Sequence, residues 1–195
     1  MKALVLVMAS TALCLSACNR SDRSDTTANQ DVTVTEDGLA DGMDNGAMAA
    51  PAELPTTAPE FVNAAAASDK FEIESSRLAQ ASGSSAAVKS FAQQMITAHT
   101  ASTAKLKSTI AGISPPITPN DALNAEQQSL MAGLQGKTGA ELDSAYAAAQ
   151  VTAHQKTLDM LNAYANRGEN PQLVALAKRM IPTVTAHLNT AKGLK

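Results

Sequence analysis

Apolar residues recur at intervals of four and three along four long stretches of the chain between residues 58 and 195. This spacing is typical of helices that bury one face, and no stretch shows the strict alternation expected of a strand. Clusters of glycine, proline and small polar residues separate the four stretches, at SGSS, GISPPITPN and RGENP. The pattern therefore predicts an all-α domain.

The breaks also predict where each helix begins and ends. Proline suits the first turn of a helix, whereas a proline cluster or a glycine ends one. We expect long helices from Pro59 to the SGSS break, from about Ser85 to Ala111, from a cap at Thr138 to a stop at Gly168, and from Pro171 to about Lys192, with Asn170 as the cap of the last. A shorter helix is expected to begin at Asn120 or Asp121 and to end between Gly133 and Gly136.

The connections between these helices predict the topology. Two are tight turns, whereas residues 112–137 form a long middle connection that contains the short helix. A connection of this length can cross the bundle from end to end, which makes the second and third long helices parallel. We therefore predict an antiparallel four-helix bundle over residues 58–195, ferritin-like, with a crossover segment between its second and third long helices.

The N-terminal residues predict an exported, lipid-anchored protein. One basic residue, Lys2, precedes an uncharged run from Ala3 to Ala17, which is too short for a comfortable transmembrane helix. The run ends in Leu15-Ser16-Ala17-Cys18, which resembles the lipobox of bacterial lipoproteins. We expect a signal peptide over residues 1–17 and lipidation of Cys18, the alternative being an ordinary secretory signal. By resemblance to Gram-negative lipoproteins, Asn19 favours the outer membrane, facing the periplasm.

Charge separates a tether from the helical domain. Between residues 19 and 57 two arginines stand against eight acidic residues, and no apolar period is sustained. Such a segment cannot bury enough surface to offset its ordering entropy, so residues 18–57 are expected to form a flexible acidic tether behind the lipid. The chain has three Phe, two Tyr and no Trp, and no basic patch. Nucleic acid is therefore not an expected partner.

All three histidines of the chain follow the dipeptide Thr-Ala, as His99, His154 and His187. Each occupies a position of the buried face of its predicted helix. His99 lies about 14 residues into its helix and His154 about 15 into the next, while His187 is offset by roughly 5 Å at 1.5 Å per residue. The first helix adds Glu72 on its own buried face. One carboxylate and three imidazoles could thus converge from four helices.

Four segments of the chain resemble a known family. They are FEIESSRLAQ, VKSFAQQMITAHT, YAAAQVTAHQ and LAKRMIPTVTAHLNTA, and they are similar in order and content to the domain-of-unknown-function 4142 family of exported bacterial proteins. The resemblance covers about Phe61 to Leu194, and it implies a ferritin-like bundle without an established activity. It places the recurring glutamate of the family at Glu72 and the histidines at His99, His154 and His187. Members often have aspartate where this chain has Ala98 and Ala153.

Two functions of different classes fit these observations. The first is a non-catalytic envelope lipoprotein with a binding or structural role, whose histidines form buried hydrogen bonds and which needs no cofactor; its protein or envelope partner is not identified. The alternative is a periplasmic bundle that binds zinc or copper through Glu72, His99, His154 and His187, with Met95 as a soft ligand for copper. A di-iron oxidase is disfavoured because no Glu-x-x-His motif occurs in the chain. No motif of another enzyme class is present, so catalysis is not expected.

Overall fold

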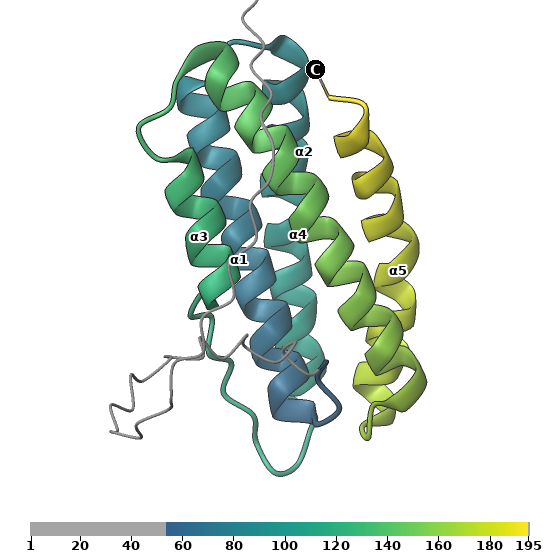
Figure 1. Ribbon diagram of the computed structural model, residues 1–195. Coiled ribbons are helices and arrows are strands. Elements are labelled where there is room, and N and C mark those ends of the chain that lie inside the picture. Colours follow the sequence, from purple (N-terminus) through teal and green to yellow (C-terminus); the bar gives the residue numbers. More distant parts are fainter. Residues whose placement is uncertain (1–53, 195) are drawn as a thin grey trace, which may run out of the picture. The chain divides into compact units, whose positions relative to one another are not determined.

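The computed structural model describes residues 54–194, and these contain five helices and no strand. The helices are α1 (Ala58–Ser82), α2 (Ala86–Ile110), α3 (Ala125–Leu134), α4 (Gly139–Arg167) and α5 (Pro171–Lys192) (Figure 1). The all-α prediction is confirmed. The expected signal peptide, Cys18 and residues 18–53 of the expected tether lie outside the described residues.

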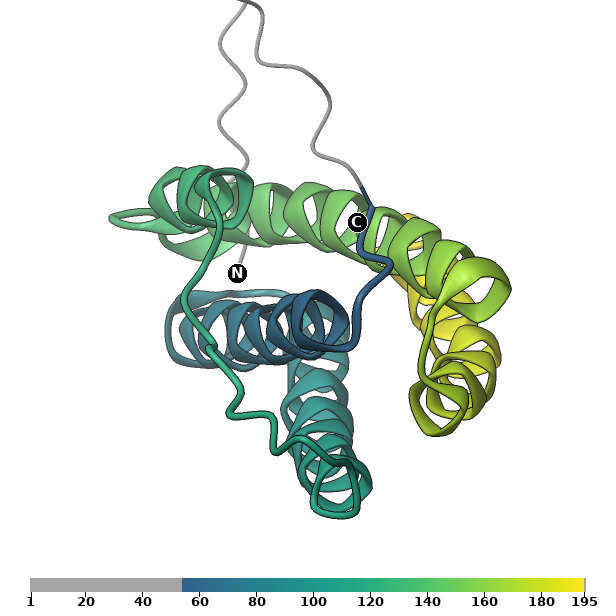
Figure 2. The same ribbon diagram turned by 90° about the horizontal axis from the view of Figure 1, so that it is seen from below.

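The four long helices form a bundle in which neighbours are antiparallel (Figures 1 and 2). Helix α1 packs against α2 and α4, and α5 packs against α4 and α2, so α2 and α4 face each other diagonally. Helix α3 lies against α1 and α4 and returns the chain to the end of the bundle where α2 began (Figure 1). Because of this return α2 and α4 run in the same direction, as the length of the crossover predicts. No helix of the described part is long and apolar enough to cross a membrane.

Most helix ends lie where the capping residues predict them. The Asn170 side chain accepts hydrogen bonds from the backbone N–H groups of Gln172 and Leu173, which fixes the start of α5. The Ser85 hydroxyl accepts from the N–H of Val88 at the start of α2. A capping side chain satisfies N–H groups that have no partner inside the helix.

The predicted start of the short helix at Asn120 or Asp121 is wrong. Helix α3 begins at Ala125, where Asn124 and Gln127 form a capping box. Asn120 is engaged elsewhere, because its N–H donates to Asn63 Oδ1 on α1 and its own Oδ1 accepts from the N–H of Ala122. The side chain therefore stabilises a turn of the crossover.

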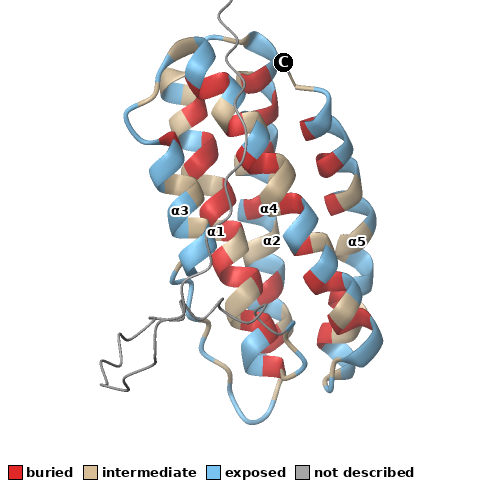
Figure 3. Cartoon of the chain, in the orientation of Figure 1, coloured by how far each residue is buried: buried red, intermediate tan, exposed pale blue. Residues whose placement is uncertain are grey.

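The core consists of two apolar clusters, one toward each end of the bundle. One contains the stacked rings of Phe61 and Tyr164, whose centroids lie 4.0 Å apart, and the other contains Phe71 and Tyr146. Figure 3 shows buried residues recurring along each long helix. Where the two clusters meet, each long helix carries buried polar residues, here called the polar layer: Asp69 and Glu72 on α1, His99 on α2, Gln150 and His154 on α4, and His187 on α5.

The predicted buried face of the third long helix is rotated relative to the observed one. The spacing of four and three residues through His154 predicts Ala147, Val151 and Leu158 in the core, yet all three are only half-buried. Tyr146 and Gln150 occupy the core instead, with relative exposures of 0%. Alanine occurs on several faces of this helix, so the apolar pattern fits two buried faces that differ by one residue. The larger side chains decide which of the two faces the core.

Replacement of Asp143 by alanine is expected to lower the free energy of unfolding by about 2–3 kcal/mol. This α4 carboxylate accepts from the N–H and hydroxyl of Ser84 and from the N–H of Ser85, at 2.6–3.2 Å, at the turn before α2. The Ser84 hydroxyl bond and the two N–H bonds hold the pKa of Asp143 below its usual range. Loss of a charged acceptor leaves these donors unpaired. Urea denaturation measures the effect.

Glu141→Ala is the control for this variant, because Glu141 is exposed and pairs only with Lys137. An exposed pair of this kind contributes less than about 1 kcal/mol. Equal unfolding midpoints for the two variants would contradict the role assigned to Asp143.

Candidate metal centre

The imidazoles of His99, His154 and His187 meet in the polar layer between the two apolar clusters. Each ring offers one nitrogen that lies within 4.8 Å of those of the other two. The ring centroids are 5.6–5.9 Å apart, and the relative exposures are 6%, 1% and 6%. The offset of His187 expected from residue counting does not separate it from the others. The structure thus brings the three predicted histidines together.

A buried carboxylate orients His99. The Nδ1 of His99 lies 2.8 Å from Asp69 Oδ1, and the Thr103 hydroxyl donates to Asp69 Oδ2 at 3.0 Å. A carboxylate accepts only, so the proton of the neutral imidazole lies on Nδ1 and the lone pair on Nε2. An Asp–His pair of this kind is the usual outer support of a metal-bound imidazole.

The orientation of His154 is fixed by its own helix. Its Nδ1 donates to the backbone carbonyl of Gln150 at 2.9 Å. The same nitrogen lies 3.5 Å from Glu72 Oε1. These contacts again place the proton on Nδ1 and leave Nε2 with a lone pair.

One buried nitrogen in each ring has no hydrogen-bond partner among the described residues. These atoms are Nε2 of His99, Nε2 of His154 and Nδ1 of His187. Leaving a buried polar atom unpaired costs about 1–3 kcal/mol, so one such atom on each ring of the cluster calls for a ligand. Converging lone pairs of neutral imidazoles fit a late transition-metal ion. Nitrogens bound at about 2.0 Å would lie roughly 3.3 Å apart, so the rings must close slightly on the ion.

Glu72 reaches this layer but contacts a different side of the histidine cluster. Its carboxylate faces the Nδ1 side of His154, opposite the nitrogen that has no partner. The structure therefore brings Glu72 against His154 but does not place it in the group formed by the three histidines. Met95, the predicted soft ligand, is fully buried in the apolar cluster that contains Phe71 and Tyr146.

Electrostatics keep two of the rings neutral. Burial, aided by the charge of His99, lowers the pKa of His154 to about 3 and that of His187 to about 4. Burial also opposes the charging of His99, but the hydrogen bond to Asp69 and the charge of Glu72 prevail and raise its pKa. Burial raises the pKa of Glu72 to about 7. Two of the three imidazoles thus offer their lone pairs without competition from protons near neutral pH.

Asp69 is a residue of this candidate site that the sequence pattern does not predict. It is 3% exposed and lies one turn before Glu72 on α1. The sequence contains a signal for it, because Asp69 and Glu72 are three residues apart and therefore share a helix face. Two carboxylates on one face of an alanine-rich helix indicate either that this face is exposed to solvent or that it carries buried polar residues. Here both carboxylates are buried.

Comparisons with known proteins give a family and a fold. A family model described as a domain of unknown function, DUF4142, matches residues 44–194. A solved structure described as CopM in the Cu(II)-bound form is similar to this chain, with a TM-score of 0.58 and 14% sequence identity. The similarity covers 70% of this chain and 94% of that one, and at this identity it shows the fold. No curated protein matches the chain.

Proposed function

The chain belongs to the DUF4142 family, and from that premise we propose that its bundle binds one copper ion through His99, His154 and His187. The observation that carries this proposal is the meeting of three buried imidazoles, each with a nitrogen within 4.8 Å of those of the other two. Each ring also has a buried nitrogen without a hydrogen-bond partner among the described residues. This favours the metal-binding alternative of the sequence analysis over buried histidines that only hydrogen-bond, because a purely structural cluster would pair its nitrogens.

Copper is the proposed ion because of the three imidazole donors and because of the order in which divalent metals bind to such donors. Imidazole nitrogen binds both copper and zinc, but sites of a given type bind Cu²⁺ more tightly than Zn²⁺. The similar solved structure is of a protein in its Cu(II)-bound form, which supports copper in a bundle of this shape. Zinc is the competing ion that an experiment has to include.

The proposed role is to hold the ion and not to catalyse a reaction. Asp69 and Glu72 support His99 and His154 from outside, which fixes the imidazoles and increases their basicity. Tight binding by pre-oriented ligands suits sequestration of copper in the cell envelope. No residue of the cluster is proposed as a nucleophile or a catalytic acid.

We further propose that the chain is anchored in the envelope through lipid on Cys18. The support is the lipobox-like Leu15-Ser16-Ala17-Cys18 after an uncharged run. Labelled fatty acid is expected to enter the wild type and not Cys18→Ser. Equal labelling of the two would refute the anchor without affecting the metal proposal.

Equilibrium dialysis of the purified full chain against buffered Cu²⁺, with Zn²⁺ as competitor, tests the copper proposal. We expect one equivalent of copper per chain, retained against an excess of zinc. The charge-transfer and electron paramagnetic resonance spectra of the ion should show nitrogen ligands. Less than half an equivalent, or binding that survives replacement of all three histidines by alanine, would refute the proposal.

Asp69→Ala is expected to weaken copper binding by about 10–100-fold although all three ligands remain, which is the usual effect of losing an outer support. The reason is that His99 loses the acceptor that fixes its Nδ1 proton. Competition with a chelator of known affinity measures the change. Asp159→Ala is the matched control, since Asp159 is an exposed residue of α4. Equal copper affinities for the two variants would show that Asp69 does not support the ion.

A further inference from the structure

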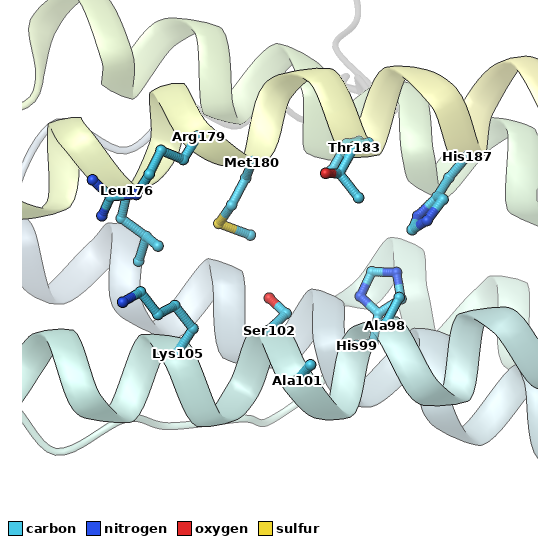
Figure 4. A pocket seen from close by; sticks show the side chains of 11 residues that line it. Ala98, His99, Ala101, Ser102, Lys105, Leu176, Arg179, Met180, Thr183 and His187 are labelled. Carbon is cyan, nitrogen blue, oxygen red and sulfur yellow. The ribbon is translucent and has the colours of Figure 1, made fainter.

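A groove between α2 and α5 leads from the surface of the bundle to the three-histidine cluster. It has a volume of about 350 Å³. His99 and His187 line one end of it, whereas His154 does not line it. Figure 4 shows the rings of these two histidines side by side at one end of the groove. An ion held by the three imidazoles would therefore be covered by protein on the His154 side and open on the groove side.

The charges along this groove are positive. Lys105 and Arg179 lie at the end away from the histidines, on opposite walls (Figure 4). No lining residue is acidic, and neither cation forms an ion pair within the described part of the chain. A free Cu²⁺ ion approaching by this route is repelled, while an anion is attracted. The groove therefore suits an anionic ligand of the ion better than the bare ion.

Between its two ends the groove is lined mainly by apolar side chains. Met180 and Val184 of α5 and Ala101 of α2 line this part, and Leu176 lies at the end beside Lys105 and Arg179 (Figure 4). Lys105 lies six residues after His99 and Arg179 eight before His187, which is roughly 9–12 Å along the helices at 1.5 Å per residue. An occupant that reaches both ends needs two polar termini separated by an apolar chain of that length.

We propose that this groove binds a small organic dicarboxylate that completes the coordination of the copper ion. One carboxylate lies between Lys105 and Arg179, where the guanidinium can bind it in a bidentate manner. The methylene chain packs along Met180 and Val184, and the second carboxylate occupies the open position of the ion. This inference rests on the proposed function, because the second carboxylate requires the ion.

The test compares suberate with octanoate on the copper-loaded full chain. The two probes have chains of equal length and differ by one carboxylate. We expect suberate to bind at least about 10-fold more tightly than octanoate, as two anchored ends predict. We also expect suberate to change the electron paramagnetic resonance spectrum of the ion, because an oxygen ligand is added. Titration followed by that spectrum measures both effects.

Two double variants separate the groove from general charge effects. Lys105→Ala with Arg179→Ala should abolish the preference for suberate and leave the copper stoichiometry at its wild-type value. Arg77→Ala with Lys107→Ala makes the same change of charge at residues that line a different groove, between α1 and α2. This control should keep the preference for suberate.

The outcomes distinguish failure of this inference from failure of the copper proposal. Equal binding of suberate and octanoate, or an unchanged spectrum of the copper-loaded chain, overturns the dicarboxylate site alone. The same holds if the Lys105 and Arg179 variant keeps the preference for suberate. A chain that takes up no copper in the absence of any carboxylate overturns both proposals.

Discussion

His154→Ala is expected to abolish tight copper binding and the stabilisation that copper gives to the folded chain. His154 is 1% exposed and is the proposed ligand that does not line the groove. Two remaining imidazoles leave the ion with too few protein donors for tight binding. For the wild type, free copper at 1,000 times its dissociation constant should add about 4 kcal/mol to the free energy of unfolding. Thermal unfolding with copper and with chelator measures this difference.

The copper-loaded form of each variant has to be compared with its own metal-free form, because loss of a buried side chain also destabilises the metal-free fold. The relevant quantity is the change in melting temperature between the copper-loaded and the chelated sample of each protein. Gln155→Ala, at the exposed neighbouring position, is the control and should keep the full copper-dependent shift. A shift in His154→Ala as large as in the wild type would exclude this residue as a ligand.

Acidification is expected to destabilise the metal-free chain, by several kcal/mol between about pH 6.5 and pH 3. The pKa values of His154 and His187 are lowered to about 3 and 4 in the fold, mainly by burial. Above the unfolded value of about 6.5 both states are neutral, and their stabilising contribution is fully present. As the pH falls, the unfolded chain binds protons that the folded chain cannot, so stability is lost through the folded pKa values.

Glu72 acts in the opposite sense over part of this range. Its pKa is raised to about 7 by burial, so its contribution is present below about pH 4.5 and is lost as the pH rises toward 7. His99 acts in the same sense as Glu72, because its pKa is raised in the fold and its contribution is lost as the pH rises. We expect the lowered pKa values of His154 and His187 to prevail, so that the net stability falls on acidification. Thermal unfolding of the chelated chain from pH 8 to pH 4 measures it. His154→Gln should show a shallower dependence, and a wild-type stability that is flat or rises toward pH 4 would contradict the neutral state of these rings.

The convergence of the histidines could be predicted because a helix advances by a fixed rise per residue. Counting from capped ends placed His99 and His154 at one level, and the crossover made their helices parallel. The start and end of α5 were equally predictable, since Pro171 and Asn170 fix its first turn and Lys192 is its last residue. Both predictions depend on local rules that tertiary packing does not change here.

The residues that were missed lie where local rules are ambiguous. On α1 the spacing of four residues before Glu72 predicts Ser68 on the buried face. Ser68 is only half-buried and hydrogen-bonds to Thr157, while the adjacent Asp69 is buried. Residues 64–67 are all alanine, so the apolar pattern does not define which side of the helix turns inward. The partner of Asp69 is His99, 30 residues away on another helix. A contact of this kind follows from packing and is invisible to sequence spacing.

The crossover through α3 divides the centre between two helical hairpins. The α1–α2 hairpin carries His99 with its support Asp69, and the α4–α5 hairpin carries His154 and His187. An ion bound as proposed would therefore act as a reversible cross-link between the hairpins, closing chain segments of 55 and 88 residues. Neither hairpin holds all three of the proposed ligands, so separation of the hairpins would release the ion without any change in the ligands themselves.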